Sequence, residues 1–223
     1  GMLIRAGASN REMIGALGRP LVLAATGGRD SRVSMVTFAG QPNLSYFTFH
    51  MPSINHLSDD VQVATRLAKI ADMPISVYEL EKYGSAEFRK ALSAHSPRAI
   101  WPQTAFCYLQ EFPSNAIHIR SAVSEIGRVF YGRRTAKTVT TDGLAQTYTQ
   151  TEFSKDPMVK ATMQDFIDTT NFSEKIFFNY DLHDMFYWEH RISKWQGILC
   201  AEAEMATDVF IPFNNRNLLK LFM

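Results

Sequence analysis

A short glycine-containing segment, residues 26–31, carries hydroxyls, backbone amides and a carboxylate in an order that suits phosphate chemistry: Thr-Gly-Gly-Arg-Asp-Ser. The apolar run at residues 20–25 predicts a buried strand before it, and residues 33–39 can continue as a helix after it. Glycine lets backbone N–H groups approach an anion, and a helix start offers free N–H groups and the positive end of its dipole. This order of elements therefore predicts a phosphate-binding loop.

The polar groups of this loop suit a phosphate and a metal ion. The expected phosphate donors are two backbone amides and two hydroxyls, those of Gly27, Gly28, Thr26 and Ser31. Asp30 can hold Mg²⁺ beside the phosphates, because magnesium prefers carboxylate and phosphate oxygens. The spacing is neither that of a Walker A loop, which needs a Lys, nor the Gly-x-Gly-x-x-Gly of dinucleotide sites. The alternative is a Gly-Gly turn, capped by Asp30 or Ser31, that binds no ligand.

Composition limits the classes of protein to be considered. The chain has 223 residues, 46% of them hydrophobic, and a formal net charge of +1, as in a globular protein with one large core or a core plus a small helical domain. The near-zero charge argues against a nucleic-acid binder, and no apolar run reaches the roughly 18 residues that a membrane helix needs. The two cysteines lie among apolar residues, which favours reduced thiols in a cytoplasmic protein.

Strand and helix patterns alternate through the first part of the chain. Apolar or aromatic runs predict four strands, at residues 20–25, 45–49, 75–80 and 116–120. Helical periodicity predicts helices around residues 57–68, 86–94 and 103–112. The alternation predicts an α/β fold with a Rossmann-like, doubly wound parallel sheet, in which ligands bind at the carboxyl ends of the strands. The 26–31 loop and the segment after Arg120 would then open on the same edge of the sheet.

The second part of the chain has a different pattern. After about residue 135 the strand signal fades, and residues 155–169 and 181–205 have helical patterns. We therefore expect an α/β core at residues 1–134 and a helical C-terminal region at residues 135–223, packed as one structural unit. The Thr-rich stretch at residues 135–150 is expected to be a mobile segment.

Three stretches together resemble the synthetase domain of the asparagine synthetase family. Residues 26–31 resemble the Ser-Gly-Gly-x-Asp-Ser loop of the ATP pyrophosphatases, with Thr26 in place of the first Ser. Residues 60–68 resemble the family's Asp-x-x-x-Ala-x-x-x-Ala helix, and residues 117–132 stand where the family carries Ser-Gly-x-Gly-x-Asp-Glu. Residues 189–214 are similar to the closing helices of such domains, so the resemblance covers most of the chain.

The resemblance implies a fold and a reaction. The implied fold is that of adenine nucleotide α-hydrolase-like proteins, and the implied enzyme is an AMP-forming carbon–nitrogen ligase that binds ATP and Mg²⁺. A small-molecule carboxylate attacks the α-phosphate, pyrophosphate leaves, and an amine or ammonia displaces AMP. The loop would neutralise charge on the departing pyrophosphate. Arg29 or Arg32 would add positive charge, although Arg32 can equally lie on the helix surface.

The third stretch departs from the family pattern. Its residues 121–125, Ser-Ala-Val-Ser-Glu, lack both glycines and the aspartate of the family motif, and Glu125 is the candidate for the missing second magnesium ligand. The alternative is an ion pair of Glu125 with Arg120 or Arg128 that holds the loop. Residues 2–4 offer no N-terminal Cys of a glutaminase domain. The chain would therefore use ammonia or another amine directly, or be a fragment of a longer protein.

Other polar residues have both a ligand-binding and a structural interpretation. His50 ends the second strand, where it can recognise the edge of an adenine or cap the strand. Glu189, Arg191 and Lys194 can line a carboxylate-binding cleft or form a solvated helix face. Two hypotheses for the whole chain follow: an ATP-binding ligase, or a non-catalytic nucleotide-binding module that has lost part of its metal site. Either can work with a partner subunit or as a homo-oligomer.

Overall fold

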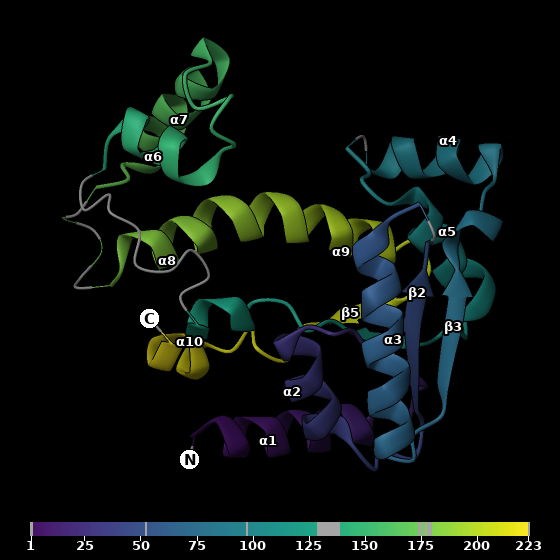
Figure 1. Ribbon diagram of the computed structural model, residues 1–223. Coiled ribbons are helices and arrows are strands. Elements are labelled where there is room, and N and C mark those ends of the chain that lie inside the picture. Colours follow the sequence, from purple (N-terminus) through teal and green to yellow (C-terminus); the bar gives the residue numbers. More distant parts are fainter. Residues whose placement is uncertain are drawn as a thin grey trace. The chain divides into compact units, whose positions relative to one another are not determined.

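The structure, a computed structural model, describes residues 2–51, 53–96, 98–128, 139–173, 175, 177 and 180–222. It contains a five-stranded sheet in which all neighbouring strands are parallel. The strands are β1 Leu21–Ala24, β2 Leu44–His50, β3 Ile75–Glu79, β4 Ile117–Ile119 and β5 Asp208–Phe210. Their order, β3-β2-β1-β4-β5, confirms the predicted α/β fold with a Rossmann-like, doubly wound sheet (Figure 1).

Helices connect and follow the strands. The α-helices are α1 Met2–Ala16, α2 Arg29–Phe38, α3 Asn55–Ile70, α4 Ala86–His95, α5 Pro102–Glu111, α6 Thr141–Tyr148, α7 Pro157–Thr170, α8 Leu182–Phe186, α9 Gly197–Ala203 and α10 Arg216–Phe222. Two 3₁₀ segments, η1 Leu80–Lys82 and η2 Ser124–Arg128, and a π-helix, η4 Tyr187–Gln196, complete the described elements. Within the described part of the chain, no helix combines the length and apolar character that crossing a membrane requires.

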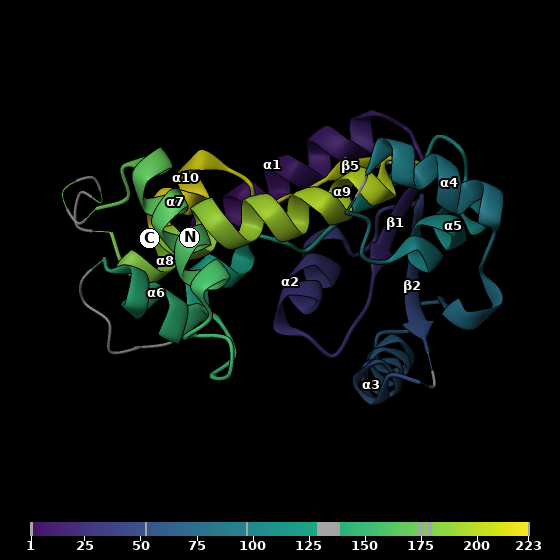
Figure 2. The ribbon, with the colours of Figure 1, turned by 90° about the horizontal axis from the view of Figure 1, so that it is seen from above.

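The apolar side chains of β1 point alternately to the two faces of the sheet, because successive side chains of a strand point in opposite directions. Leu21 and Leu23 belong to a buried cluster with Phe38 of α2. Val22 belongs to a second cluster, with Tyr108 of α5. Figure 2 shows α2 and α3 on one side of the strands and α5 and α9 on the other. In the described part of the chain, helices therefore cover both faces of the sheet.

The chain divides into two compact units. The sheet unit comprises residues 1–124 and 195–218, and the helical unit comprises residues 125–194 and 219–223. In the helical unit, α6 packs against α7 around a buried aromatic core that includes Phe166 and Phe186. The boundary that the sequence predicts between residues 134 and 135 stays a prediction.

One expectation for the C-terminal part of the chain is wrong. The sequence predicts no strand after about residue 135, but β5 pairs in parallel with β4, with Ile117 opposite Asp208. A strand of three residues is too short to show a period-2 pattern. Part of the segment at residues 135–150 forms α6, whose N-cap Thr140 accepts a hydrogen bond from the Gly143 amide at 3.0 Å, and the expected mobility of the segment stays a prediction. Residues 135–138 of that segment lie outside the described residues.

Candidate functional site

The 26–31 loop lies at the point of the sheet where the strand order reverses. The chain runs outward from β1 through β2 to β3 on one side, and then returns to place β4 and β5 on the other side of β1. The loop joins the carboxyl end of β1 to the first residue of α2, Arg29. In open parallel sheets, ligands bind in the crevice at this switch point, because the loops after the two central strands diverge there.

The loop folds around two hydroxyl groups. The side-chain oxygens of Thr26 and Ser31 are 2.9 Å apart, and the Gly28 amide donates to Thr26 Oγ1 at 3.1 Å. Ser31 Oγ also lies 3.1 Å from the Gly28 carbonyl oxygen, to which it can donate. Ser31 is buried, whereas Gly28 is exposed. The structure thus brings the predicted donors together in one turn, and Gly28 lies on the exposed side of this turn.

The Gly27 amide has a partner that the sequence analysis did not assign. It donates a 2.8 Å hydrogen bond to Oδ1 of Asp60, which lies in α3. A Cβ added to Gly27 would lie 2.8 Å from this same oxygen, so the bond requires glycine or a shift of the carboxylate. Asp60 is part of the helix pattern at residues 60–68, but a contact across 33 residues depends on tertiary packing that this pattern does not encode.

The segment after β4 contacts the loop through serine side chains. Ser124 Oγ donates to Asp30 Oδ1 at 2.8 Å, and Ser121 Oγ donates to the buried Ser34 hydroxyl of α2 at 2.8 Å. The expectation that the loop and the segment after Arg120 open on one edge is therefore confirmed. The contacting residues themselves were not predicted, because serines in loops carry no periodic signal.

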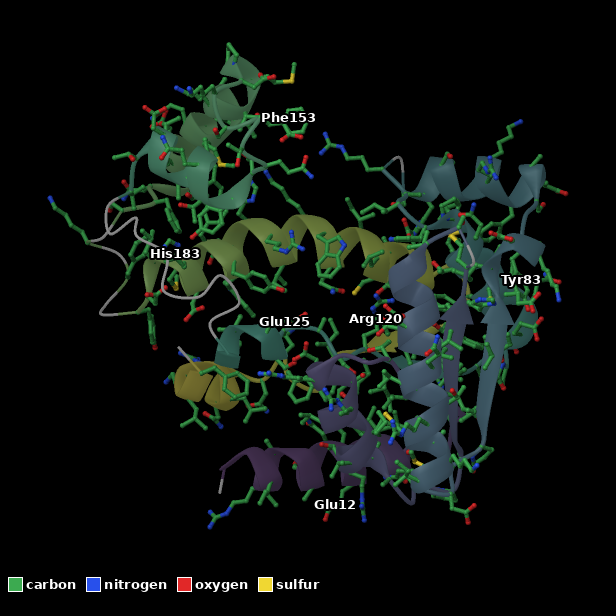
Figure 3. All side chains as sticks on the ribbon, viewed as in Figure 1. Glu12, Tyr83, Arg120, Glu125, Phe153 and His183 are labelled. Carbon is green, nitrogen blue, oxygen red and sulfur yellow. The ribbon has the colours of Figure 1, made fainter. Side chains whose placement is uncertain are left out.

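Glu125 stays a predicted metal ligand. It lies in η2, directly after Ser124, and only 7% of its surface is exposed (Figure 3). It is the first residue of the helical unit, whereas Asp30 belongs to the sheet unit. A shared magnesium ion and the alternative ion pair with Arg120 or Arg128 are both untested, and the Arg128 side chain lies outside the described residues.

The remaining predicted residues occupy different surroundings. Arg32 donates to the carbonyl oxygens of Gly28 at 3.2 Å and Gly27 at 3.3 Å, so it braces the loop from the first turn of α2. Arg29 is exposed beside it. His50, at the end of β2, is half-buried and lies opposite Glu79 of β3 in the strand register. Its predicted role in recognising adenine stays a prediction.

The candidate carboxylate-binding residues lie on the π-helix. Glu189 and Lys194 are exposed, and the Arg191 guanidinium lies 6.0 Å from the centre of the Tyr187 ring. Lys194 Nζ lies 3.3 Å from His190 Nε2. Burial and the Lys194 charge lower the pKa of His190 to about 4. The carboxylate-binding cleft that these residues were expected to line stays a prediction.

Several buried titratable groups were not predicted from the sequence. Glu202 of α9 is 1% exposed and accepts hydrogen bonds from the amides of Ile100 and Trp101, at the start of α5. His118 of β4 is 2% exposed, and burial lowers its pKa well below the usual value. Burial and the nearby Asp181 raise the pKa of Asp184 to about 6. Each lies in an apolar stretch or a helix where sequence alone does not show which residues face inward.

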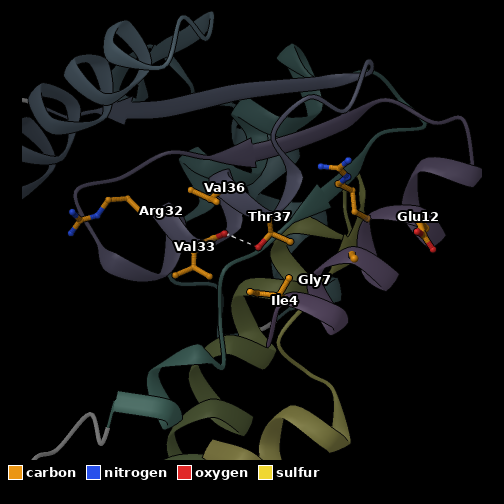
Figure 4. Close-up of a pocket in the computed structure, with 9 residues that line it drawn as sticks. Ile4, Gly7, Glu12, Arg32, Val33, Val36 and Thr37 are labelled. Atoms are coloured by element: carbon orange, nitrogen blue, oxygen red, sulfur yellow. Dashed lines mark hydrogen bonds between the residues drawn. The ribbon is translucent and has the colours of Figure 1, made fainter. Parts of the chain in front are cut away.

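A separate groove of about 670 Å³ lies between α1 and α2. Ile4, Val33 and Val36 supply apolar surface, and Figure 4 shows Arg32 and Glu12 toward opposite ends of it. Since Arg32 also donates to the Gly27 and Gly28 carbonyls, the groove adjoins the loop without including it.

Among the residues that the structure describes, no three His, Cys, Asp or Glu side chains gather in a way that could hold a metal ion. A magnesium ion held by Asp30, with or without Glu125, would therefore take its remaining ligands from phosphate oxygens and water. No protein-family model matches the chain, and no curated protein matches its sequence.

Proposed function

We propose that this chain binds Mg-ATP at the 26–31 loop and transfers AMP to a small-molecule carboxylate with release of pyrophosphate, after which an amine or ammonia forms the carbon–nitrogen bond. One observation carries the proposal: the loop joins the carboxyl end of β1 to the start of α2 at the switch point of a parallel sheet. The resemblance of its sequence to the loop of the ATP pyrophosphatases adds the preference for pyrophosphate.

The groups of the loop suit this task. The hydroxyls of Thr26 and Ser31 and the amide of Gly28 lie on one turn and hydrogen-bond one another there. A pyrophosphate group that replaces these internal bonds would receive donors from one side of the turn. The dipole of α2, a helix of 10 residues, adds positive potential at the same place. When bound, ATP supplies an α-phosphate that a carboxylate can attack. The loop stabilises the charge that develops on the departing pyrophosphate.

The carboxylate of Asp30 fits a magnesium ion bound to the same phosphates. Ser124 donates to one of its oxygens at 2.8 Å, which holds the side chain in a fixed orientation. Glu125 is the proposed second ligand. The two free cysteines in the described part of the chain, Cys107 and Cys200, agree with the proposed cytoplasmic location.

Gly28→Val tests nucleotide binding at the loop. Gly28 has φ −67° and ψ 154°, which Val can adopt, and an added Cβ would meet only Thr26 Oγ1, at 3.2 Å. The side chain would therefore occupy the space that a phosphate needs while leaving the fold largely intact. Calorimetric titration with Mg-ATP should show binding to the wild type and none to this variant.

Gly84→Val is the matched control, because an added Cβ there meets nothing within 4 Å. It should bind Mg-ATP as the wild type does. Equal affinity of a folded Gly28→Val variant would refute binding at the loop. Incubation with candidate carboxylates, ammonium and Mg-ATP should then yield AMP and pyrophosphate, and accumulation of ADP would contradict the proposed cleavage.

The second candidate function is a nucleotide-binding module without turnover. The observation that favours it is that Asp30 Oδ1 accepts the Ser124 hydroxyl and that the third stretch lacks the family's glycines and aspartate. This candidate predicts binding of ATP or AMP with no release of pyrophosphate for any carboxylate tested. The same titrations and product assays therefore separate the two functions.

A further inference from the structure

The carboxylate of Asp60 occupies a backbone donor of the proposed phosphate loop. Its Oδ1 accepts the Gly27 N–H at 2.8 Å, and the absence of a Cβ at Gly27 is what lets this oxygen approach so closely. A carboxylate oxygen and a phosphate oxygen are alike as anionic acceptors of an N–H donor. Since one N–H group makes one strong hydrogen bond, a phosphate that binds Gly27 must displace Asp60.

Displacement has an electrostatic cost as well. A pyrophosphate at the loop brings several negative charges close to the carboxylate of Asp60, which is only half-buried and keeps its place in α3. Two like unit charges about 4 Å apart repel by an amount that corresponds to about a fivefold change in affinity in bulk water, and to more near a protein surface. Magnesium bound to the phosphates offsets part of this repulsion, because it neutralises part of their charge.

We propose that Asp60 is a built-in competitor of the anion at the loop. In the empty protein it holds the Gly27 amide, and it disfavours free pyrophosphate and phosphate more than the magnesium complex. The loop therefore selects metal-complexed polyphosphate, and Asp60 sets this selectivity. This inference rests on the proposed function, because it concerns the anion that the loop is proposed to bind.

Asp60→Asn tests the competition directly. The amide oxygen of Asn can still accept from Gly27, so the loop keeps its anchor while the negative charge is lost. Asp59→Asn removes the same charge from the preceding, exposed residue and is the matched control. Inorganic pyrophosphate is titrated into the wild type and both variants by calorimetry, once with excess EDTA and once with excess magnesium, and thermal melts establish that each variant folds.

We expect Asp60→Asn to bind metal-free pyrophosphate about fivefold to tenfold more tightly than the wild type, and Asp59→Asn to stay within about twofold. With magnesium, the advantage of Asp60→Asn should shrink. Measurable binding by Asp60→Asn alone would also support the proposal, since it would mean that competition masks the site in the wild type.

Three results would overturn the inference. Equal affinities of the wild type and Asp60→Asn would show that the loop binds pyrophosphate without competition, and the proposed function would survive. Weaker binding by Asp60→Asn would make Asp60 a group that holds the anion or its metal, again with the proposed function intact. No binding by any of the three proteins, with or without magnesium, would refute both the competition and the proposed function.

Discussion

Glu202 gives the structure its most direct test, because it caps a helix from a distant part of the chain. Its side chain is 1% exposed, and it accepts hydrogen bonds from the Ile100 amide and from the Trp101 amide, the latter at 3.1 and 3.2 Å. Trp101 is the N-cap of α5 and provides no side-chain acceptor of its own. Glu202 therefore accepts the N–H groups of the N-cap and of the residue before it, as the Glu of a capping box accepts the N-cap N–H, and not the donors of the first helical turn.

The cost of Glu202→Ala follows from these bonds. Two part-buried amides lose a hydrogen bond to a charged acceptor, and each such bond contributes about 1.5–3 kcal/mol. We expect a loss of about 3 kcal/mol in the free energy of unfolding. For a chain of this size, that corresponds to a fall in melting temperature of about 6–12 °C. Glu202→Gln keeps an acceptor oxygen and should lose only about 1 kcal/mol.

Thermal and urea denaturation followed by circular dichroism measure these changes. Glu204→Ala is the control, because Glu204 is exposed at the end of the same helix. It should stay within about 0.5 kcal/mol of the wild type. A loss below about 1 kcal/mol for Glu202→Ala would refute the capping argument, and equal losses for Ala and Gln would show that the charge of Glu202, rather than its acceptor oxygen, stabilises α5.

Three further predictions concern single side chains. Burial lowers the pKa of His118, so protonation of this side chain is less favourable in the folded chain than in the unfolded chain. The free energy of unfolding should therefore fall below about pH 6.5, by up to about 1.4 kcal/mol per pH unit. His118→Leu should reduce this pH dependence in urea titrations at pH 7 and 5. The pKa of Asp184 is raised to about 6, so the folded state loses stability as the pH rises from about 4 to 6. Asp184→Asn should be about 1–2 kcal/mol more stable than the wild type at pH 7. An unchanged melting temperature of this variant would contradict the burial argument. Ser124→Ala removes the donor to Asp30 and should weaken Mg-ATP binding up to about tenfold in calorimetry with little change in melting temperature; unchanged affinity would separate Asp30 from the nucleotide.

The sequence predicts the frame of the sheet unit because that frame depends on local patterns. The strands β1 to β4 and the helices between them show apolar runs or helical periodicity long enough to recognise. β5 has three residues, and its place beside β4 depends on pairing with residues some 90 positions earlier, which no local window contains. The sequence does not show the partner of the Gly27 amide for the same reason, because the packing of α3 places Asp60 beside this amide.

The hydroxyls and glycine amides of the 26–31 loop have hydrogen-bond partners within the protein. Thr26 and Ser31 pair with each other through their side-chain oxygens, so internal hydrogen bonds hold the turn. The Gly27 amide is different, because its acceptor is a carboxylate supplied from another helix. An anion that binds this amide must therefore displace a charged acceptor. The question that decides the function is therefore whether a polyphosphate competes successfully with Asp60 for the same N–H group.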